Sequence, residues 1–293
     1  MTVVVGYLVG RDSDAALRLA AETATTFQAG LAVATVVPRP WTTPSPARVD
    51  AEYAQYADRL ASDSAAQAKE CIEALGHGLQ TSYHKVANRS VSGGLLNAVS
   101  ELNAEVLVLG SASEGTPGRI SVGSTSDRLL HSSPVPLAIS PHGYHGSATG
   151  SLTRISCAYP ARSDGIELVK SVVALGLRLN LPVRVLTFAV RGRTMYPPEV
   201  GLHAEDSILQ VWASQAREAL ANLRTDGVVG DDIACQVVMG NDWGEALDAA
   251  GWHDGEILAL GTARREPIAR VFLGSRGSKI VRHSPVPVLV LPA

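Results

Sequence analysis

The chain alternates short, continuous apolar runs with longer segments in which apolar residues recur at helical spacing. The run Thr2–Val9 is typical of a strand that is buried on both faces of a sheet. The segment Ser13–Ala29 has the helical period, and we expect Gly30 to end that helix. The first half continues the alternation, with strands predicted at Leu31–Val37, Thr81–Val86, Glu105–Leu109 and Val135–Ser140 and helices at Ala47–Leu75, Ser92–Leu102 and about Ser124–His131.

Strands and helices that alternate in this way form a parallel sheet covered by helices on both faces. The second half repeats the order, so the expected fold class is α/β, with two tandem Rossmann-like domains that each hold a five-stranded parallel sheet. The expected domains are residues 1–143 and 151–293, joined by a linker at 144–150, because the stretch Pro141–Ser147 is rich in glycine and lacks any periodicity.

The two halves also repeat in sequence. Gly110 and Gly261 lie 151 positions apart, as do Gly123 and Gly274. The same offset aligns further pairs: Ser133-Pro-Val-Pro with Ser284-Pro-Val-Pro, Val4 with Ile155, Leu17 with Leu168, and Gly93 with Gly244. Because the glycine and proline positions match as well as the apolar ones, we interpret the chain as a duplicated unit.

Composition narrows the class of protein. Of the 293 residues, 46% are hydrophobic and 18% are charged, with a net charge of −3, so each half can bury a core and a disordered chain is excluded. The charge balance argues against a nucleic-acid partner. We find no apolar run of the ~18 residues that a membrane helix needs and no signal peptide. The scattered cysteines Cys71, Cys157 and Cys235 indicate reduced thiols and a cytoplasmic location.

Glycine-bearing loops mark the expected ligand site. Ligands of such sheets bind beyond the carboxyl ends of the strands where strand order reverses, here Leu8–Asp12 and Gly110–Ser113. A glycine and a serine at the start of a helix present backbone N–H groups and a hydroxyl to an anion. The sequence therefore predicts a phosphate cradle at Gly123, Ser124 and Ser126. The alternative is a simple turn at Gly123, with Ser124 as the helix cap.

At these residues both halves resemble the universal stress protein family, in a tandem form. The resemblance is most specific in the last part of each half: strand, glycine, loop, Gly-Ser, helix, Ser-Pro-Val-Pro and final strand. The nucleotide-binding branch of that family carries G-x2-G-x9-G-[ST]. The resemblance implies that ATP, with Mg²⁺, binds at the matching positions, which are Gly110, Ser113, Gly123 and Ser124 in the first half and Gly261, Arg264, Gly274 and Ser275 in the second.

The chain departs from the family pattern at two kinds of position. Ser113 and Arg264 replace the middle glycine. A serine would strain a backbone with positive φ, and an arginine would either block the pocket or bind a phosphate. The branch also has an aspartate at the end of the first strand, which contacts the nucleoside. In the 151 register that position holds Leu8 in the first half and Tyr159 in the second, where the tyrosine either stacks on a base or packs in the core.

The resemblance implies a stress-response regulator that binds ATP or a related adenine nucleotide, with no catalytic residue and no metal ligand expected. The alternative is a nucleotide-free interaction module with degenerate loops that works through dimer surfaces. Slow nucleotide hydrolysis is a third reading, for which Glu114 and Asp127 are the nearby acids of the first half. The basic cluster between Arg264 and Arg282 is either a solvated face or an anion site.

The final strands, Val135–Ser140 and Val286–Leu291, are apolar and contain proline near their starts. The family pairs this strand between protomers. The resemblance therefore implies that the two halves pair with each other as an intramolecular pseudo-dimer, and we also expect the whole chain to form a homodimer. A shielded sheet edge in a monomer is the alternative.

Overall fold

The computed structural model describes residues 1–10, 14–39, 47–162, 165–191, 202–265 and 270–292. Helices and strands follow the predicted order in the first half, and the second half repeats that order with two additional short strands. The first half contains β1 (Thr2–Gly6), α1 (Asp14–Phe27), β2 (Gly30–Pro38), α2 (Ala47–Leu75), β3 (Thr81–Asn88), α3 (Val91–Glu101), β4 (Val106–Gly110), α4 (Ser124–Leu130) and β5 (Leu137–Ser140). The second half contains β6 (Arg154–Ala158), α5 (Ile166–Leu179), β7 (Val183–Val190), α6 (Leu202–Thr225), β8 (Ala234–Gly240), α7 (Trp243–Asp248), β9 (Glu256–Gly261), β10 (Ala263–Arg265), β11 (Arg270–Phe272), α8 (Gly274–His283) and β12 (Val288–Leu291).

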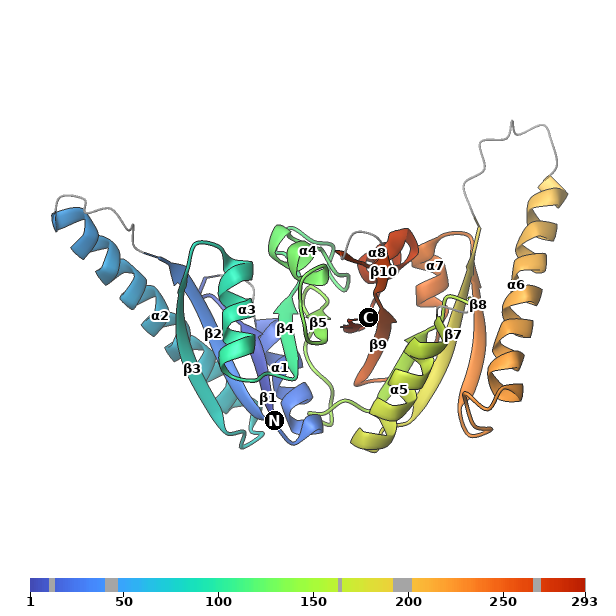
Figure 1. The fold of residues 1–293 in the computed structure, drawn as a ribbon, viewed down its shortest axis with the longest axis horizontal. Coiled ribbons are helices and arrows are strands. Elements are labelled where there is room, and N and C mark those ends of the chain that lie inside the picture. The colour runs from blue at the N-terminus through green and yellow to red at the C-terminus, as the bar shows by residue number, and fades with distance from the viewer. Residues whose placement is uncertain (11–13, 40–46, 163–164, 192–201, 266–269, 293) are drawn as a thin grey trace.

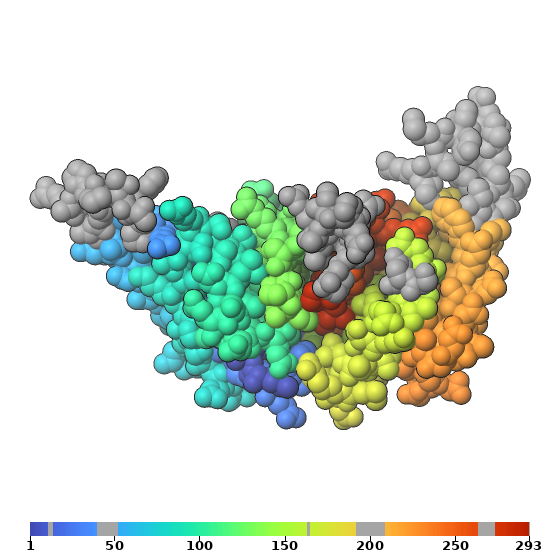
Figure 2. Space-filling model, viewed as in Figure 1, coloured from blue at the N-terminus to red at the C-terminus, as the bar shows by residue number. Residues whose placement is uncertain are grey.

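Ten of these strands form one continuous sheet in the order β3-β2-β1-β4-β5-β12-β9-β6-β7-β8 (Figure 1). The five strands of each half run parallel to one another, as predicted. The halves meet where β5 pairs antiparallel with β12, with Ala138 opposite Leu289. In Figure 2 the first half, blue to green, and the second half, yellow to red, are in direct contact. The pairing covers an apolar edge that each half would otherwise expose.

Each face of the sheet has its own core, because successive strand residues point to opposite faces. Val3 and Val5 of β1 belong to a cluster that contains Leu17 of α1 and Leu223 of α6, and Val4 belongs to a second cluster. Residues of α1, α2, α5 and α6 join the first cluster, whereas residues of α3, α4, α7 and α8 join the second. The predicted arrangement, with helices on both faces, is confirmed.

The segment predicted as a linker, residues 144–150, is fastened to α1. The carboxylate of Glu22, 2% exposed, accepts hydrogen bonds from the hydroxyl of Tyr144 (2.6 Å) and from the backbone N–H of Ser147. Burial, followed by the negative charge of Glu22, raises the pKa of the Tyr144 hydroxyl. Just beyond the segment, the N–H of Leu152 donates to Thr26 Oγ1 (2.9 Å). The connection between the halves is therefore an ordered segment that hydrogen bonds hold against α1, and we call residues 144–150 the clasp.

Several element ends differ from the predictions, among them the starts of β5 and β12, which are Leu137 and Val288 rather than Val135 and Val286. The ends of α1 and β1 show the physical reasons. Helix α1 ends before Gly30, because Gln28 takes the left-handed conformation (φ 50°) and the N–H of Ala29 already bonds to Ala24 O at 2.9 Å. Gly30 instead opens β2. Strand β1 ends at Gly6 rather than at Val9, whose N–H donates to the side chain of Ser64 on α2 (3.1 Å).

The offset between the halves is 151 in β4 and β9 but 152 in the preceding strands. Val3 pairs with Val106 in the first half, and Ile155 pairs with Ile257 in the second. Val106 and Ile257 are 151 apart, whereas Val3 and Ile155 are 152 apart. The predicted matches of Val4 with Ile155 and of Leu17 with Leu168 were therefore wrong by one residue.

The register changes after the start of the third helix of each half. Ser90 caps α3 and Asp242 caps α7, and these residues are 152 apart. Gly110 and Gly261, which end β4 and β9, are 151 apart. The second half thus has one residue fewer between these points. Helices tolerate such a change at their ends, whereas a shift within a buried strand would move every side chain to the other face.

Candidate functional site

The glycine loop of the first half lies at the carboxyl edge of the sheet, between β4 and α4. An ideal Cβ placed on Gly110 would lie 3.4 Å from the Cβ of Ala16, which is an ordinary van der Waals contact with α1. An ideal Cβ on Gly123 would lie 3.3 Å from the Cβ of Ala112, which is tighter than most real contacts. Gly123 therefore lets the loop close against its own first residues.

Hydrogen bonds fix the shape of this loop. The N–H of Ser121 donates to Ser111 Oγ (2.6 Å), and the N–H of Ala112 donates to Ser121 O (2.9 Å), so the two ends of the loop lie side by side. The N–H of Gly118, at φ +73°, donates to His142 O (2.9 Å). The loop is thus held at its base and at its far turn.

The serines of the predicted cradle have different surroundings. Ser113 and Ser124 are exposed, whereas Ser126 is buried at 5% exposure. Ser113 is not among the described non-glycine residues with positive φ, so the strain expected for a serine there is absent. The loop accepts this serine because its backbone does not take the left-handed conformation at that position.

Helix α4 begins without a side-chain cap. Its N-cap residue is Gly123 (φ −78°), and Ser124 is the first helical residue, so the alternative in which Ser124 caps the helix is wrong. Helix α3 differs, since Ser90 Oγ accepts from the N–H of Gly93 (3.1 Å). Asp242 caps α7 in the same way. The first amides of α4 therefore lack the side-chain acceptor that α3 and α7 have.

Tyr7, rather than Leu8, is the residue of the first half that corresponds to Tyr159. The N–H of Tyr7 donates to Ala34 O (3.1 Å), and the N–H of Tyr159 donates in the same way to Leu186 O (2.8 Å). Both rings are buried, at 3% and 6% exposure, so the packing reading of Tyr159 is confirmed. Leu8 lies two residues beyond β1 and is half-buried.

The Tyr7 hydroxyl is a group that the sequence analysis missed. It is buried and has no hydrogen-bond partner among the residues that the structure describes. Burial raises its pKa to about 12, and the charges of Asp14 and Cys71 act in the same direction. The signal in the sequence was a tyrosine at the same place in both halves, but it appears only in the 152 register.

The second half builds its loop differently. Gly261 ends β9, where an ideal Cβ would lie 3.3 Å from Leu168 Cδ1. Arg264 lies on β10, opposite Val271 of β11, in a hairpin without a counterpart in loop 111–123. The side chain of Arg264 lies outside the described part. Gly274 starts α8 at φ +74°, in contrast to Gly123, and the neighbouring Ser275 is exposed.

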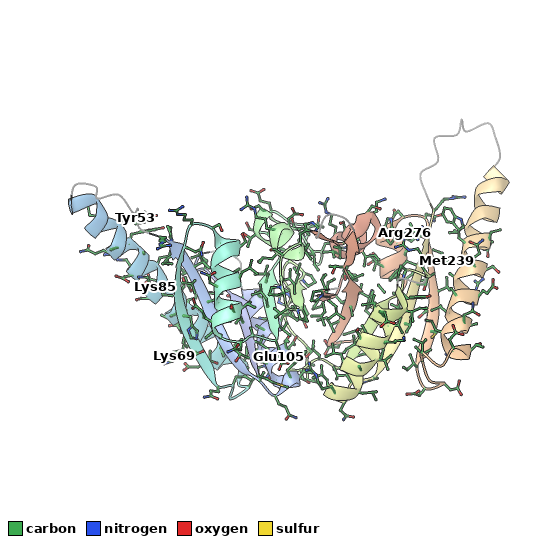
Figure 3. The ribbon with its side chains drawn as sticks, viewed as in Figure 1. Tyr53, Lys69, Lys85, Glu105, Met239 and Arg276 are labelled. Atoms are coloured by element: carbon green, nitrogen blue, oxygen red, sulfur yellow. The ribbon has the colours of Figure 1, made fainter. Side chains whose placement is uncertain are left out.

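Two small cavities among the described residues lie where the halves meet, and neither lies over the ends of β1 and β4. The first is a crevice between α4 and α8, lined by Val122, Asp127, Leu130, His131, Leu273, Ser278, Val281 and Arg282. Glu114, the other acid considered for hydrolysis, is exposed on the loop. Of the basic cluster, Arg276, Lys279 and Arg282 are exposed on α8, and Arg276 is labelled in Figure 3.

Two kinds of feature are absent from the described part of the chain. No group of three or more His, Cys, Asp or Glu side chains there is arranged to hold a metal ion. No described helix is both long enough and apolar enough to span a bilayer. The three cysteines are free thiols, with Cys157 buried in the second half.

Comparison with known proteins assigns the family. The model of the universal stress protein family matches residues 1–141 and 153–292. Universal stress proteins of Mycobacterium tuberculosis and Mycobacterium bovis are each 57% identical over 292 residues, which cover 100% of both chains. A universal stress protein from Archaeoglobus fulgidus has a similar fold, with a TM-score of 0.58, 16% identity and coverage of 99% of this chain and 98% of that one.

A functionally unknown protein from Pseudomonas aeruginosa PAO1 has the same fold, with a TM-score of 0.60, 13% identity and coverage of 99% and 92% of the two chains. The two separate family matches coincide with the two parallel halves of the sheet. The chain therefore belongs to the universal stress protein family and carries two domains of that family in tandem.

Proposed function

We propose that the chain is a stress-response regulator that binds ATP or a related adenine nucleotide at the loop of its first half. The phosphates lie over Gly123, Ser124 and Ser126, with Gly110 and Ser113 along the loop. The base lies against the ends of β1 and β2, near Leu8. The observation that carries the proposal is the start of α4, whose amides follow the family's Gly-Ser pair and have no side-chain cap.

These features fit a polyphosphate. Helix amides without an internal partner attract anions, and the helix dipole adds to the attraction. The exposed hydroxyl of Ser124 is a further donor. Mg²⁺, where required, would enter with the nucleotide and neutralise part of its charge, and we assign no residue of the chain as its ligand.

The second half is the weaker candidate site, formed by Gly261, Arg264, Gly274 and Ser275. Its loop is replaced by the β10–β11 hairpin, and α8 begins at a left-handed glycine. A ligand there would meet a more basic surface, since Arg276 and Lys279 follow in the helix. We therefore propose the first half as the principal nucleotide site.

One observation favours the nucleotide-free interaction module. The loop of the first half is closed by its own hydrogen bonds, and the two small cavities lie at the contact between the halves rather than over the strand ends. In that case the protein acts through its dimer surfaces and not through a bound nucleotide. We also propose domains at 1–143 and 151–293 with a linker at 144–150, a cytoplasmic location, and a homodimer of the whole chain.

Calorimetric titration with ATP and Mg²⁺ tests the proposal. We expect the wild-type chain to release heat. We expect Gly123→Val to weaken binding about 10- to 100-fold, because its side chain would keep the phosphate away from the first amides of α4, and a lost hydrogen bond to a charged group costs about 1.5–3 kcal/mol. Ser132→Ala is the matched control. Ser132 is exposed beyond the far end of α4, where it donates to Arg128 O at 2.8 Å, and its loss should leave the affinity unchanged.

Absorbance of the purified protein at nucleotide wavelengths provides the second readout. No heat of binding together with no co-purified nucleotide would reject the nucleotide site and leave the interaction module. Equal affinities for the wild type and Gly123→Val would place any binding elsewhere in the molecule.

A further inference from the structure

We propose that the first-half loop is coupled to the second half through Arg119, so that a nucleotide bound at one loop alters the other half of the molecule. The inference rests on the proposed nucleotide site and adds its regulation. It starts from an arginine that the sequence analysis did not single out. Arg119 lies on the loop between β4 and α4, four residues before Gly123.

Arg119 reaches across the contact between the halves and binds there at three points. Its Nη2 lies 2.7 Å and 2.6 Å from the two carboxylate oxygens of Asp248, and its Nη1 donates to His283 O at 3.0 Å. The Arg119 side chain is 26% exposed and that of Asp248 is 54% exposed. A guanidinium that donates hydrogen bonds to a carboxylate and a carbonyl in this way fixes the orientation of these groups relative to the arginine as well as their distance from it.

The contact points lie at the ends of two helices. Asp248 is the last residue of α7, and His283 is the last residue of α8. Helix α8 begins at Gly274 and Ser275, which are the candidate site residues of the second half. One rigid helix therefore connects the second-half loop to the carbonyl that Arg119 binds.

The backbone on both sides of Arg119 is held as well. Arg119 O accepts from the N–H of His142 (2.8 Å), which follows β5 closely, and β5 pairs with β12 of the other half. The next residue, Ile120, is 2% exposed and shares a core cluster with Leu273 and Val286. A movement of the loop is therefore transmitted directly to residues of the second half.

Coupling of this kind is reciprocal. If a nucleotide at the first loop changes the position or the mobility of α7 and α8, then a ligand at the start of α8 changes the affinity of the first loop by the same factor. A chain of packed residues and hydrogen bonds is the physical route that such coupling requires. The tandem arrangement makes this route part of a single chain.

A second ion pair between the halves provides a matched control. Arg178 of α5 lies 3.4 Å from Glu105, which precedes β4, with side chains 49% and 31% exposed. Figure 3 labels Glu105 at the amino end of the strands, away from the loop. Both pairs join an arginine to a carboxylate across the halves, but the Arg178 pair has no bond to loop 111–123 among those that the structure describes.

Hydrogen–deuterium exchange with saturating ATP and Mg²⁺ tests the proposal in the full chain. In the wild type we expect nucleotide to slow amide exchange in residues 111–123 and also in residues 244–249 and 280–284. Arg119→Ala should keep the protection of 111–123 and lose most of the protection of 244–249. Arg178→Ala should keep the protection of both segments, 111–123 and 244–249. Asp248→Asn should lose most of the protection of 244–249, as Arg119→Ala does, although this substitution leaves the sequence of the loop unchanged.

The outcomes separate the two proposals. Protection that is confined to 111–123 in the wild type would overturn the coupling and retain the nucleotide site. Equal protection of 244–249 in the wild type, Arg119→Ala and Asp248→Asn would also overturn it. No protection at any segment, at the highest nucleotide concentration tested, would reject the nucleotide site and the coupling together.

Discussion

Glu256 is a carboxylate with no exposed side-chain surface, at the amino end of β9. It accepts hydrogen bonds from Arg154 Nη2 (2.6 Å), Arg184 Nε (2.9 Å) and the hydroxyl of Ser156. The N–H of His253 adds a fourth bond at 2.8 Å. Burial alone raises the pKa of Glu256, but these hydrogen bonds and the charge of Arg184 lower it below its usual value. The ionised carboxylate is therefore the form that the folded state stabilises.

Replacement of this carboxylate predicts a large loss of stability. Glu256→Gln leaves two guanidinium groups without their buried partner, so we expect the free energy of unfolding at pH 7 to fall by about 3–5 kcal/mol. Because the folded pKa of Glu256 is depressed, its contribution is complete above the unfolded pKa and is lost as pH falls through the folded value. The difference in the free energy of unfolding between wild type and Glu256→Gln should therefore become smaller below about pH 4.3. Denaturant unfolding from pH 7 to pH 3 measures it.

Glu105→Gln is the control for this change. Glu105 holds the corresponding place in the first half, but its side chain is 31% exposed and the guanidinium of Arg178, its described partner across the halves, lies 3.4 Å away. An exposed pair of this kind contributes less than about 1 kcal/mol. Similar losses for Glu105→Gln and Glu256→Gln, or a difference that does not depend on pH, would contradict the account of Glu256.

At the scale of elements, close packing of α7 against β8 depends on a glycine. An ideal Cβ on Gly240 would lie 2.5 Å from the backbone N of Ala246 and 2.8 Å from its Cα. Backbone atoms inside a helix cannot move aside as the end of a side chain can. Helix α7 therefore sits at its present distance from the sheet because position 240 has no side chain.

Gly240→Ala is expected to destabilise the chain by about 1–3 kcal/mol, the usual cost of forced overpacking. Gly30→Ala is the matched control, because Gly30 is also a strand residue and its ideal Cβ would have Gln80 O as nearest neighbour, at 3.6 Å. Thermal unfolding of both variants provides the comparison. A melting temperature that falls equally in both would show that glycine at 240 has no special packing role.

The sequence was sufficient for the order and kind of most elements, because the central strands are continuous apolar runs and the long helices have a regular period. The short strands β10 and β11 were not predicted. The helix Ala47–Leu75 was predicted with the bounds that the structure has. The end of α1 was not predictable in this way. Gln28 rather than Gly30 takes the left-handed turn, and only the hydrogen bond from Ala29 to Ala24 reveals it.

The candidate site was predicted less completely than the fold. Gly110 and Gly123 are brought to one edge of the sheet, as their positions after a strand and before a helix implied. The correspondence of Tyr7 with Tyr159 was hidden, because it needs an offset of 152 and the sequence analysis used a constant offset of 151. The second half has one residue fewer between the start of α7 and the end of β9 than the first half has between the start of α3 and the end of β4. Arg119 was hidden for another reason, since its partners are 129 and 164 residues away.

At the scale of the whole molecule, the two duplicated halves are joined into a single structural unit. The sheet is continuous through β5 and β12, the clasp at 144–150 fixes α1 to the second half, and Arg119 ties the first loop to α7 and α8. Such a unit transmits a local change at one loop more readily than two domains on a flexible tether would. Because the two loops differ in structure, the two candidate sites are not equivalent.

The central claim is that the first-half loop holds the phosphates of an adenine nucleotide, and a crystal structure of the full chain grown with ATP and Mg²⁺ tests it most directly. The account predicts phosphate oxygens within hydrogen-bond distance of the backbone N–H groups that open α4, at Ser124 to Ser126. A bare loop in crystals that contain bound nucleotide elsewhere, such as in the crevice between α4 and α8, would contradict it.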